Sequence, residues 1–156
     1  MMNNVKTKKK PKTKEKVKGG KKPKEVVQAN SYLGKNPVWR FHRSDSEHSK
    51  WSLQEKSYLD NELIEKLIGF EGMTWQQIQN ASGGRSSGTN SHFIDVEDLI
   101  TEAKSRLVEL NVYNDQLFSL RLTGSKRLFG ILEDGVFHVI WYDRNHEICP
   151  SKKRNT

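Results

Sequence analysis

Apolar residues recur at helical spacing in the middle of the chain. Leu59, Leu63 and Leu67 stand four positions apart and follow Ser52-Leu-Gln-Glu55, a capping-box pattern in which a Ser or Thr precedes a Glu or Gln by three residues. Side chains four apart lie on one side of a helix, where they can pack together. The pattern therefore predicts a helix from about 53 to 68.

Two further helices are predicted behind the first. The capping pattern occurs again at Thr74-Trp-Gln-Gln77 and predicts a shorter helix that stops at Ser82-Gly-Gly84. Residues 82–91 contain three glycines and four serines, which favours a loop. A third helix is predicted to open at Asp95 and to extend to about residue 110, because an apolar stripe follows. Its members are Val96, Ile100, Ala103, Leu107 and Leu110.

The spacing changes from helical to alternating in the C-terminal part of the chain. Apolar side chains there alternate with Ser119 and Arg121, as in a strand with one buried face. Short polar turns separate this segment from two more apolar runs, and tight turns join antiparallel neighbours. We therefore predict a three-stranded antiparallel meander. Its strands cover about 118–122, 127–132 and 136–142.

These elements predict an α+β domain, with about three N-terminal helices packed on one face of the C-terminal meander. The other face of the sheet would be open to a ligand. A run of aromatic and β-branched residues at 37–42 can add an early strand. The predicted organisation is a disordered lysine-rich tail over 1–30, a single domain over 31–150 and a basic tail over 151–156.

Positive charge is concentrated at the N-terminus. The formal net charge of the chain is +8, and residues 1–25 contain eleven lysines and two glutamates, a balance of 11 − 2 = +9. The remaining residues therefore sum to 8 − 9 = −1. The tail has too few apolar residues to offset the chain entropy of folding. Two interpretations stay open for it: an electrostatic arm that binds RNA or a ribosome by releasing counterions, and a tail that only solubilises the chain.

Cysteine and histidine usage argues against a metal centre. Cys149 is the only cysteine, which excludes an intramolecular disulfide and a Cys-based zinc site within one chain. His42, His48 and His138 lack metal-ligand spacing with a third partner, and we predict no cofactor. No stretch approaches the roughly 20 apolar residues of a membrane span, and no signal-peptide core follows the N-terminus. We expect a cytoplasmic protein that does not contact a membrane.

The run Leu117–His146, LFSLRLTGSKRLFGILEDGVFHVIWYDRNH, resembles the C-terminal half of RelE/YoeB-type bacterial toxins. In that family an arginine-bearing strand, a turn, a second strand starting with Arg and a hydrophobic residue, an acidic turn and a third strand lead to a terminal His or Tyr. The resemblance implies a RelE-like fold and a toxin–antitoxin role. It implies a hydrolase of the mRNA interferase type: an endoribonuclease that cuts mRNA without a metal, usually in the ribosome, by attack of a ribose 2′-hydroxyl on the adjacent phosphate. It also implies a cognate antitoxin protein as partner.

The resemblance assigns roles to three residues. Arg127 would stabilise the charge that develops on the phosphate, and Arg121 would be a second phosphate contact, because a guanidinium binds phosphate in a bidentate manner. His146 would be the acid or base, a task suited to a side chain that titrates near neutral pH. The residues expected to bind RNA around this site are Lys126, Tyr142, Arg144, Lys152 and Lys153.

The chain departs from the family pattern in two respects. Ten residues follow His146, whereas the family often ends at or just after its terminal His or Tyr. The general base of the family, which precedes the first strand of the meander, has no match by motif. His92 and Glu109 are its candidates by position.

Structural interpretations of the same residues stay open. Arg121 and Arg127 can be ordinary solvent-facing strand residues, His146 a turn residue that bonds the local backbone, and Tyr142 a residue that packs in the sheet. The alternative function is a non-catalytic RNA- or ribosome-binding protein that uses the basic tail. An interaction protein without RNA contact is a third interpretation.

Overall fold

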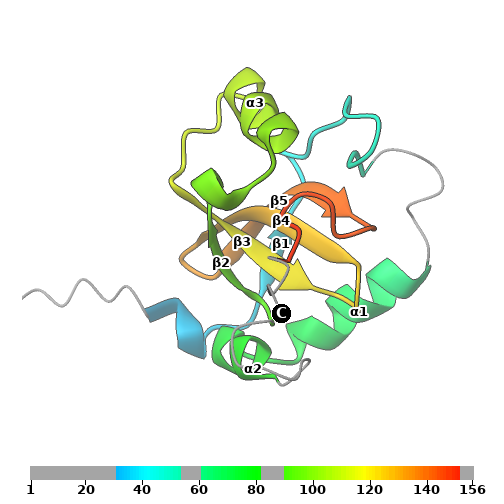
Figure 1. Ribbon diagram of the computed structural model, residues 1–156. Helices are drawn as coiled ribbons and strands as arrows, with labels where there is room; N and C mark the ends of the chain where they lie inside the picture. Colours follow the sequence, from blue (N-terminus) through cyan, green and yellow to red (C-terminus); the bar gives the residue numbers. More distant parts are fainter. Residues whose placement is uncertain (1–30, 54–60, 82–89, 152–156) are drawn as a thin grey trace, which may run out of the picture.

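A five-stranded mixed sheet forms the centre of the molecule (Figure 1). The computed structural model describes residues 31–53, 61–81 and 90–151, and the five strands lie within these ranges. β1 runs parallel to β5 and the other neighbours are antiparallel, which gives the order β1-β5-β4-β3-β2. The strands are β1 (Val38–Arg40), β2 (His92–Asp95), β3 (Gln116–Arg121), β4 (Arg127–Glu133) and β5 (Val136–Asp143).

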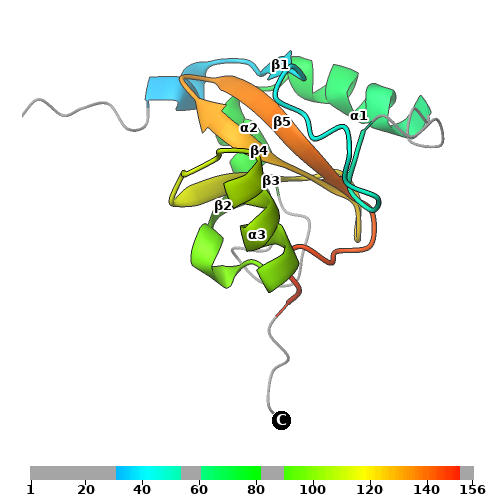
Figure 2. The same ribbon diagram turned by 90° about the horizontal axis from the view of Figure 1, so that it is seen from above.

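Helices cover both faces of the sheet, so the described part of the chain has three layers (Figure 2). α1 (Asn61–Glu71) and α2 (Trp75–Asn80) pack on one face, and α3 (Thr101–Glu109) packs on the other. Short 3₁₀-helices, η1 (Ser31–Gly34) and η2 (Val96–Asp98), precede β1 and α3.

The alternation of side chains along the central strands separates two apolar cores. Phe118 of β3 packs toward α1 and α2, whereas its neighbour Leu117 packs toward α3, because successive strand residues point to opposite faces. Each large side chain buried in this way contributes about 1.5–3 kcal/mol to stability. The α1/α2 core contains Leu63, Leu67, Trp75, Ile78, Phe118, Leu120, Leu122, Leu128, Phe137, Val139 and Tyr142. The α3 core contains Trp51, Leu99, Ala103, Leu107, Leu117, Phe129, Ile131, Ile140, Trp141 and Ile148.

The predicted architecture, three N-terminal helices on a three-stranded meander in a RelE-like arrangement, is wrong. β3, β4 and β5 form the centre of a five-stranded sheet, and the helices lie mid-chain, between β1 and β3. The early strand expected within 37–42 is present as β1, whereas β2, with four residues, is too short for a period-two pattern to identify it from sequence. The expectation of one open sheet face is also wrong, because α3 packs on that face.

The predicted helices differ in how well they match. α2 is confirmed: the Thr74 hydroxyl accepts a bond from the Gln77 N–H at 3.2 Å, and the Gln77 amide oxygen accepts one from the Thr74 N–H at 2.9 Å. The first helix was predicted to start at about residue 53, which is wrong, because Leu53 lies in a turn. Residues 54–60 of the predicted helix lie outside the described residues. α1 continues past the expected stop to Glu71.

The third helix begins six residues later than predicted. Asp95 pairs with Gln116 as the last residue of β2, and Val96 donates its backbone N–H to the Asp115 carbonyl at 2.8 Å. These long-range bonds hold the first residues of the predicted helix at the sheet, so α3 starts only at Thr101. A local apolar stripe could not reveal this competition.

Asp45 fastens α3 to the sheet. Its buried carboxylate accepts hydrogen bonds from Arg106 of α3 at 2.8 and 2.7 Å and from the Trp141 indole of β5 at 3.0 Å. Burial alone would raise the pKa of Asp45, but the hydrogen bonds from Arg106 and Trp141 outweigh it and hold that pKa well below its usual value. The ionised carboxylate thus links the segment after β1 to α3 and to β5.

Candidate functional site

The register of the sheet gathers polar side chains on the face that carries α3. His92 of β2 lies opposite Ser119 of β3, and Arg127 of β4 lies opposite both Arg121 of β3 and Asp143 of β5. Residues directly opposite each other in neighbouring strands project to the same face. The polar group therefore occupies the part of this face that the α3 core leaves uncovered.

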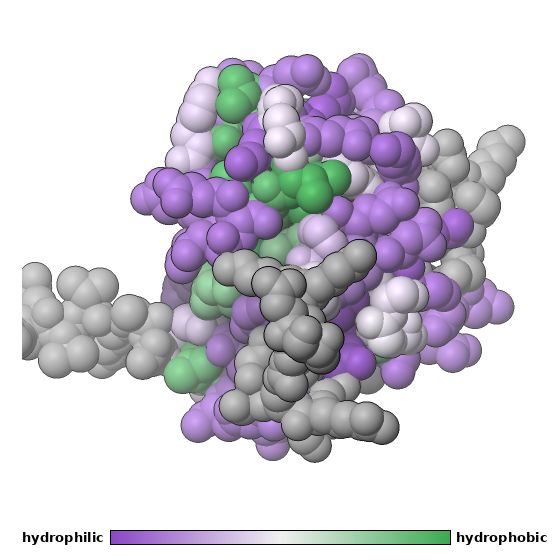
Figure 3. Space-filling model, in the orientation of Figure 1, coloured by the Kyte–Doolittle hydropathy of each residue, from purple (hydrophilic) through white to green (hydrophobic). Residues whose placement is uncertain are grey.

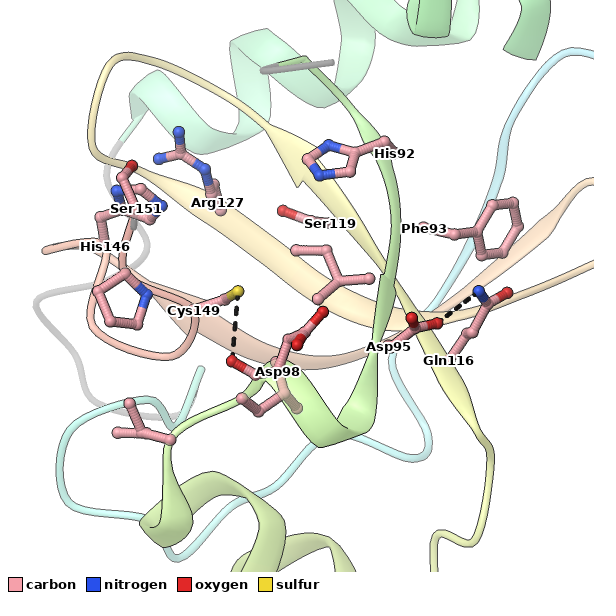
Figure 4. Close-up of a pocket in the computed structure, with 14 residues that line it drawn as sticks. His92, Phe93, Asp95, Asp98, Gln116, Ser119, Arg127, His146, Cys149 and Ser151 are labelled. Atoms are coloured by element: carbon pink, nitrogen blue, oxygen red, sulfur yellow. Dashed lines mark hydrogen bonds between the residues drawn. The ribbon is translucent and has the colours of Figure 1, made fainter. Parts of the chain in front are cut away.

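A cleft of about 650 Å³ opens over this uncovered part of the sheet. Its walls are β2, the segment from η2 to α3, the starts of β3 and β4, and the chain after β5 (Figure 4). The face shown in Figure 3 is mostly hydrophilic, with only small apolar areas. The residues lining the cleft with groups suited to chemistry are His92, Asp95, Asp98, Gln116, Ser119, Arg127, His146, Cys149 and Ser151.

His146 is held at the cleft by the turn that follows β5. The carboxylate of Asp143, which is 0% exposed, accepts the backbone N–H of Glu147 at 3.0 Å and that of Ile148 at 2.9 Å. His146 lies inside this turn with a φ of 57°, in the left-handed region that a non-glycine residue seldom adopts. Ile148 is buried, and its carbonyl accepts the Ile100 N–H at 3.0 Å. The turn is thus anchored on both sides.

The surroundings of His146 favour a neutral imidazole. Burial lowers the pKa of His146, and the positive charge of Arg127 lowers it further, while the carboxylate of Asp143 acts in the opposite direction. The net shift is downward, so at pH 7 one ring nitrogen has a lone pair that can accept a proton.

Arg127 supplies the cation of the cleft. Burial lowers the pKa of Arg127, and the like charge of Arg121 adds to this effect. A guanidinium nevertheless stays protonated at pH 7. One of its nitrogens donates to the Gly124 carbonyl at 3.1 Å, which holds the side chain beside the turn between β3 and β4. A half-buried cation in a cleft is suited to an anionic group such as a phosphate.

The structure separates the two candidates for the missing base. His92 lines the same cleft as Arg127 and His146, and its Nδ1 bonds the Asn90 carbonyl. Because a carbonyl oxygen can only accept, Nδ1 carries the hydrogen of this bond and Nε2 is left for other chemistry. Glu109 lies on α3 and forms an ion pair with Arg106, with 2.7 Å between their nitrogen and oxygen atoms. It does not line the cleft.

The other predicted site residues are dispersed. Arg121 lies opposite Arg127 but lines a neighbouring hollow of about 360 Å³. Lys126 forms a 2.6 Å ion pair with Glu62 of α1. Lys152 and Lys153 lie outside the described residues.

Tyr142 and Arg144 do not contribute to the cleft. Tyr142 is 1% exposed and packs in the α1/α2 core, on the opposite face of the sheet. A ring so enclosed cannot stack on a base, so the expected RNA contact of Tyr142 is corrected to a packing role. The guanidinium carbon of Arg144 lies over this ring, 5.7 Å from its centroid.

Three residues of the site were not foreseen from the sequence. Ser119 appeared only as a polar position in the alternation, Cys149 only as a lone cysteine, and Asp143 not at all. Their roles depend on which face each residue takes and on burial, which a short strand pattern does not determine. Within residues 31–53, 61–81 and 90–151, no three His, Cys, Asp or Glu side chains cluster as metal ligands would.

Comparison of the chain with protein-family models, curated proteins and solved structures gave no match. The resemblance to RelE/YoeB-type toxins therefore rests on residues 117–146 themselves. In the part of the chain that the structure describes, no helix has the length and apolar character needed to cross a bilayer.

Proposed function

We propose that the cleft is the active site of a metal-independent endoribonuclease. The observation that carries the proposal is that Arg127 and His146, which lie 19 positions apart in the sequence, line one cleft, with the imidazole favoured in its neutral form. Cleavage of RNA by its own 2′-hydroxyl requires such a pair: a proton acceptor, and a cation where charge develops on the phosphorus.

The proposed reaction is an internal transesterification. A base takes the proton of the 2′-hydroxyl, the 2′-oxygen attacks the adjacent phosphorus, and the bond from phosphorus to the 5′-oxygen breaks. A proton is delivered to the departing 5′-oxygen, so the products are a 2′,3′-cyclic phosphate and a 5′-hydroxyl. Arg127 stabilises the dianionic phosphorane through hydrogen bonds that strengthen as charge accumulates.

The proposed partner is mRNA, either free or in the ribosome, in the cytoplasm. An antitoxin protein that neutralises the activity is part of the proposal through the resemblance of residues 117–146. The guanidinium of Arg127 in the cleft supports a substrate with a phosphate group, and the +9 tail supports recruitment of a polyanion.

The proposal predicts that Arg127→Ala lowers cleavage by about 10²–10³-fold, because the developing charge loses its cation. The purified full-length chain is incubated with a defined mRNA, with and without ribosomes and with EDTA present, and the ends of the fragments are identified by mass spectrometry. Arg43→Ala is the matched control, because Arg43 is exposed and does not line the cleft.

The results separate this function from its alternative. Cleavage in EDTA that Arg43→Ala retains and Arg127→Ala loses, with 2′,3′-cyclic phosphate ends, would support the ribonuclease. Unchanged cleavage by a folded Arg127→Ala variant would contradict it. If no condition yields cleavage but the intact chain binds RNA, the non-catalytic RNA- or ribosome-binding function suggested by the tail is favoured.

A further inference from the structure

The candidate active site contains a second imidazole that the proposed function leaves without a role. His92 comes from β2, an edge strand, and lines the cleft together with Arg127 and His146. In the view of Figure 4, Arg127 lies between the two histidines. A phosphate bound at Arg127 would therefore have one imidazole on either side.

The sheet register gives the scale of this arrangement. His92 pairs with Ser119, which lies two residues before Arg121, the residue paired with Arg127. β2 and β4 are two strand spacings apart, so the Cα atoms of His92 and Arg127 are separated by roughly 12 Å. This separation is short enough for a phosphate bound by the Arg127 guanidinium to be part of an RNA that also reaches His92.

We propose that His92 is the general acid of the site and donates the proton of Nε2 to the departing 5′-oxygen of the RNA, with His146 as the base that accepts the 2′-hydroxyl proton. This inference rests on the proposed ribonuclease function. The bond from phosphorus to the 5′-oxygen breaks as the Nε2 proton is transferred, so the products carry a 5′-hydroxyl. The imidazolium of His146 and the neutral imidazole of His92 then exchange protons with water to restore the starting state.

The hydrogen bond of His92 to the main chain suits this role. Nδ1 carries its hydrogen in both the protonated ring and the neutral ring that remains after donation, so the bond to the Asn90 carbonyl persists throughout. The ring can therefore release its Nε2 proton without reorienting. Such a fixed orientation is what a proton donor in a transition state requires.

The two histidines are distinguished by a substrate that needs no acid. In an RNA with a single bridging 5′-phosphorothiolate, a sulfur atom replaces the 5′-oxygen, and the thiolate departs without protonation because it is a far weaker base than an alkoxide. The variants are His92→Ala, His146→Ala, Arg127→Ala and, as a matched control, His42→Ala. His42 is exposed and does not line the cleft.

We expect His92→Ala to cleave ordinary RNA about 10²–10⁴-fold more slowly than the unmodified chain, but to cleave the phosphorothiolate RNA at nearly the same rate. His146→Ala and Arg127→Ala are expected to lose both reactions. Removal of the 2′-hydroxyl proton and stabilisation of the phosphorane charge are needed whether the leaving atom is oxygen or sulfur. His42→Ala is expected to retain both. Thermal unfolding of each variant confirms its folding, and His92→Gln replaces His92→Ala if the latter does not fold.

Failure of this inference differs from failure of the ribonuclease function. If His92→Ala retains cleavage of ordinary RNA, or loses both substrates equally, His92 is not the acid although the chain is still a ribonuclease. If the unmodified chain cleaves neither substrate, the ribonuclease function itself is contradicted.

Discussion

The carboxylate of Asp143 holds the turn that carries His146 to the cleft. It lies opposite Arg127 in the sheet and accepts two successive backbone N–H groups, those of Glu147 and Ile148. The two bonds close the turn in which His146 takes a left-handed conformation, one that costs roughly 1–2 kcal/mol. A residue without contact to substrate thus determines where the proposed base stands.

Asp143→Asn tests this positioning role. The side-chain amide has one oxygen and one NH₂ group, so it can accept only one of the two backbone N–H groups and faces the other with a donor. We expect the free energy of unfolding to fall by about 1–3 kcal/mol in urea denaturation at pH 7.

Asp134→Asn provides the matched control. Asp134 is exposed, makes an ion pair only at the surface with Lys35, and has a φ of 50°, which asparagine tolerates. The free energy of unfolding of the Asp134→Asn variant should stay within about 0.5 kcal/mol of that of the unmodified chain. Equal effects of the two substitutions would show that Asp143 does not hold the turn.

Single residues of the site differ in how far the sequence reveals them. Arg127 and His146 follow from the resemblance of one contiguous run, and the structure brings them to one cleft. The sequence could not distinguish His92 from Glu109 as the candidate base, because only the pairing of β2 with β3 places His92 near Arg127. Asp143 gave no signal, because its burial depends on the whole sheet.

At the scale of elements, a bulge between β4 and β5 sets which residues face the cleft. The pairing runs from Glu133 and Val136 to Gly130 and Val139, and then shifts by one residue, so that Phe129 pairs with Trp141. Without this shift Arg127 would face Tyr142, and a shift of one residue exchanges the two faces of a strand. The bulge therefore turns Asp143 to the face that carries α3, beneath the turn of His146, and Tyr142 into the α1/α2 core.

Gly130 allows the close approach of the strands at this bulge. A Cβ atom at Gly130 would lie 2.1 Å from the carbonyl oxygen of His138, which belongs to the backbone and cannot simply rotate away. We expect Gly130→Ala to lower the free energy of unfolding by about 1–3 kcal/mol, as overpacking of a well-packed interior does, measured by denaturant titration.

Gly124→Ala controls for the loss of glycine itself, since nothing lies within 4 Å of a Cβ atom there. Its stability should match that of the unmodified chain within about 0.5 kcal/mol. If both alanine variants were equally stable, the strands at the bulge would tolerate a Cβ atom at Gly130, and the close approach would not require glycine.

Elements were predictable where their signal is local. α2 follows from the capping box of Thr74 and Gln77, which is a bond pattern between neighbours in the sequence. The early strand at 37–42 also follows from local composition and is present as β1. Its pairing with β5 and the start of α3 depend instead on partners far along the chain, the latter on Asp115 and Gln116. Sequence periodicity carries no information about such partners, and the predicted three-stranded sheet failed for this reason.

At the scale of the whole molecule, the coverage of both sheet faces confines the site to one end of the α3 face. Among the residues that the structure describes, the cleft offers few cations, since Lys126 is paired with Glu62 and Arg121 lines another hollow. We therefore expect these described residues alone to hold a polyanion of many nucleotides weakly. The sequence supplies the missing charge in residues 1–25, which carry a balance of +9.

A full-length variant with glutamine in place of the eleven lysines of residues 1–25 tests whether this charge recruits RNA. Its formal net charge changes from +8 to 8 − 11 = −3. We expect weaker binding to a short single-stranded RNA, and a plot of log affinity against log salt concentration that is shallower by about 0.7 for each phosphate that the tail no longer neutralises. Fluorescence anisotropy titrations between roughly 50 and 200 mM salt provide the measurement.

A tail with the same lysines in shuffled order is the matched control, because counterion release depends on charge and not on sequence. It should bind like the unmodified chain. An unchanged slope in the glutamine variant would show that the tail does not contact RNA and only solubilises the chain. A shallower slope together with unchanged cleavage of RNA at saturating concentration would instead assign recruitment to the tail and the reaction to the cleft, because charge that acts only on encounter alters affinity and not the bound-state rate.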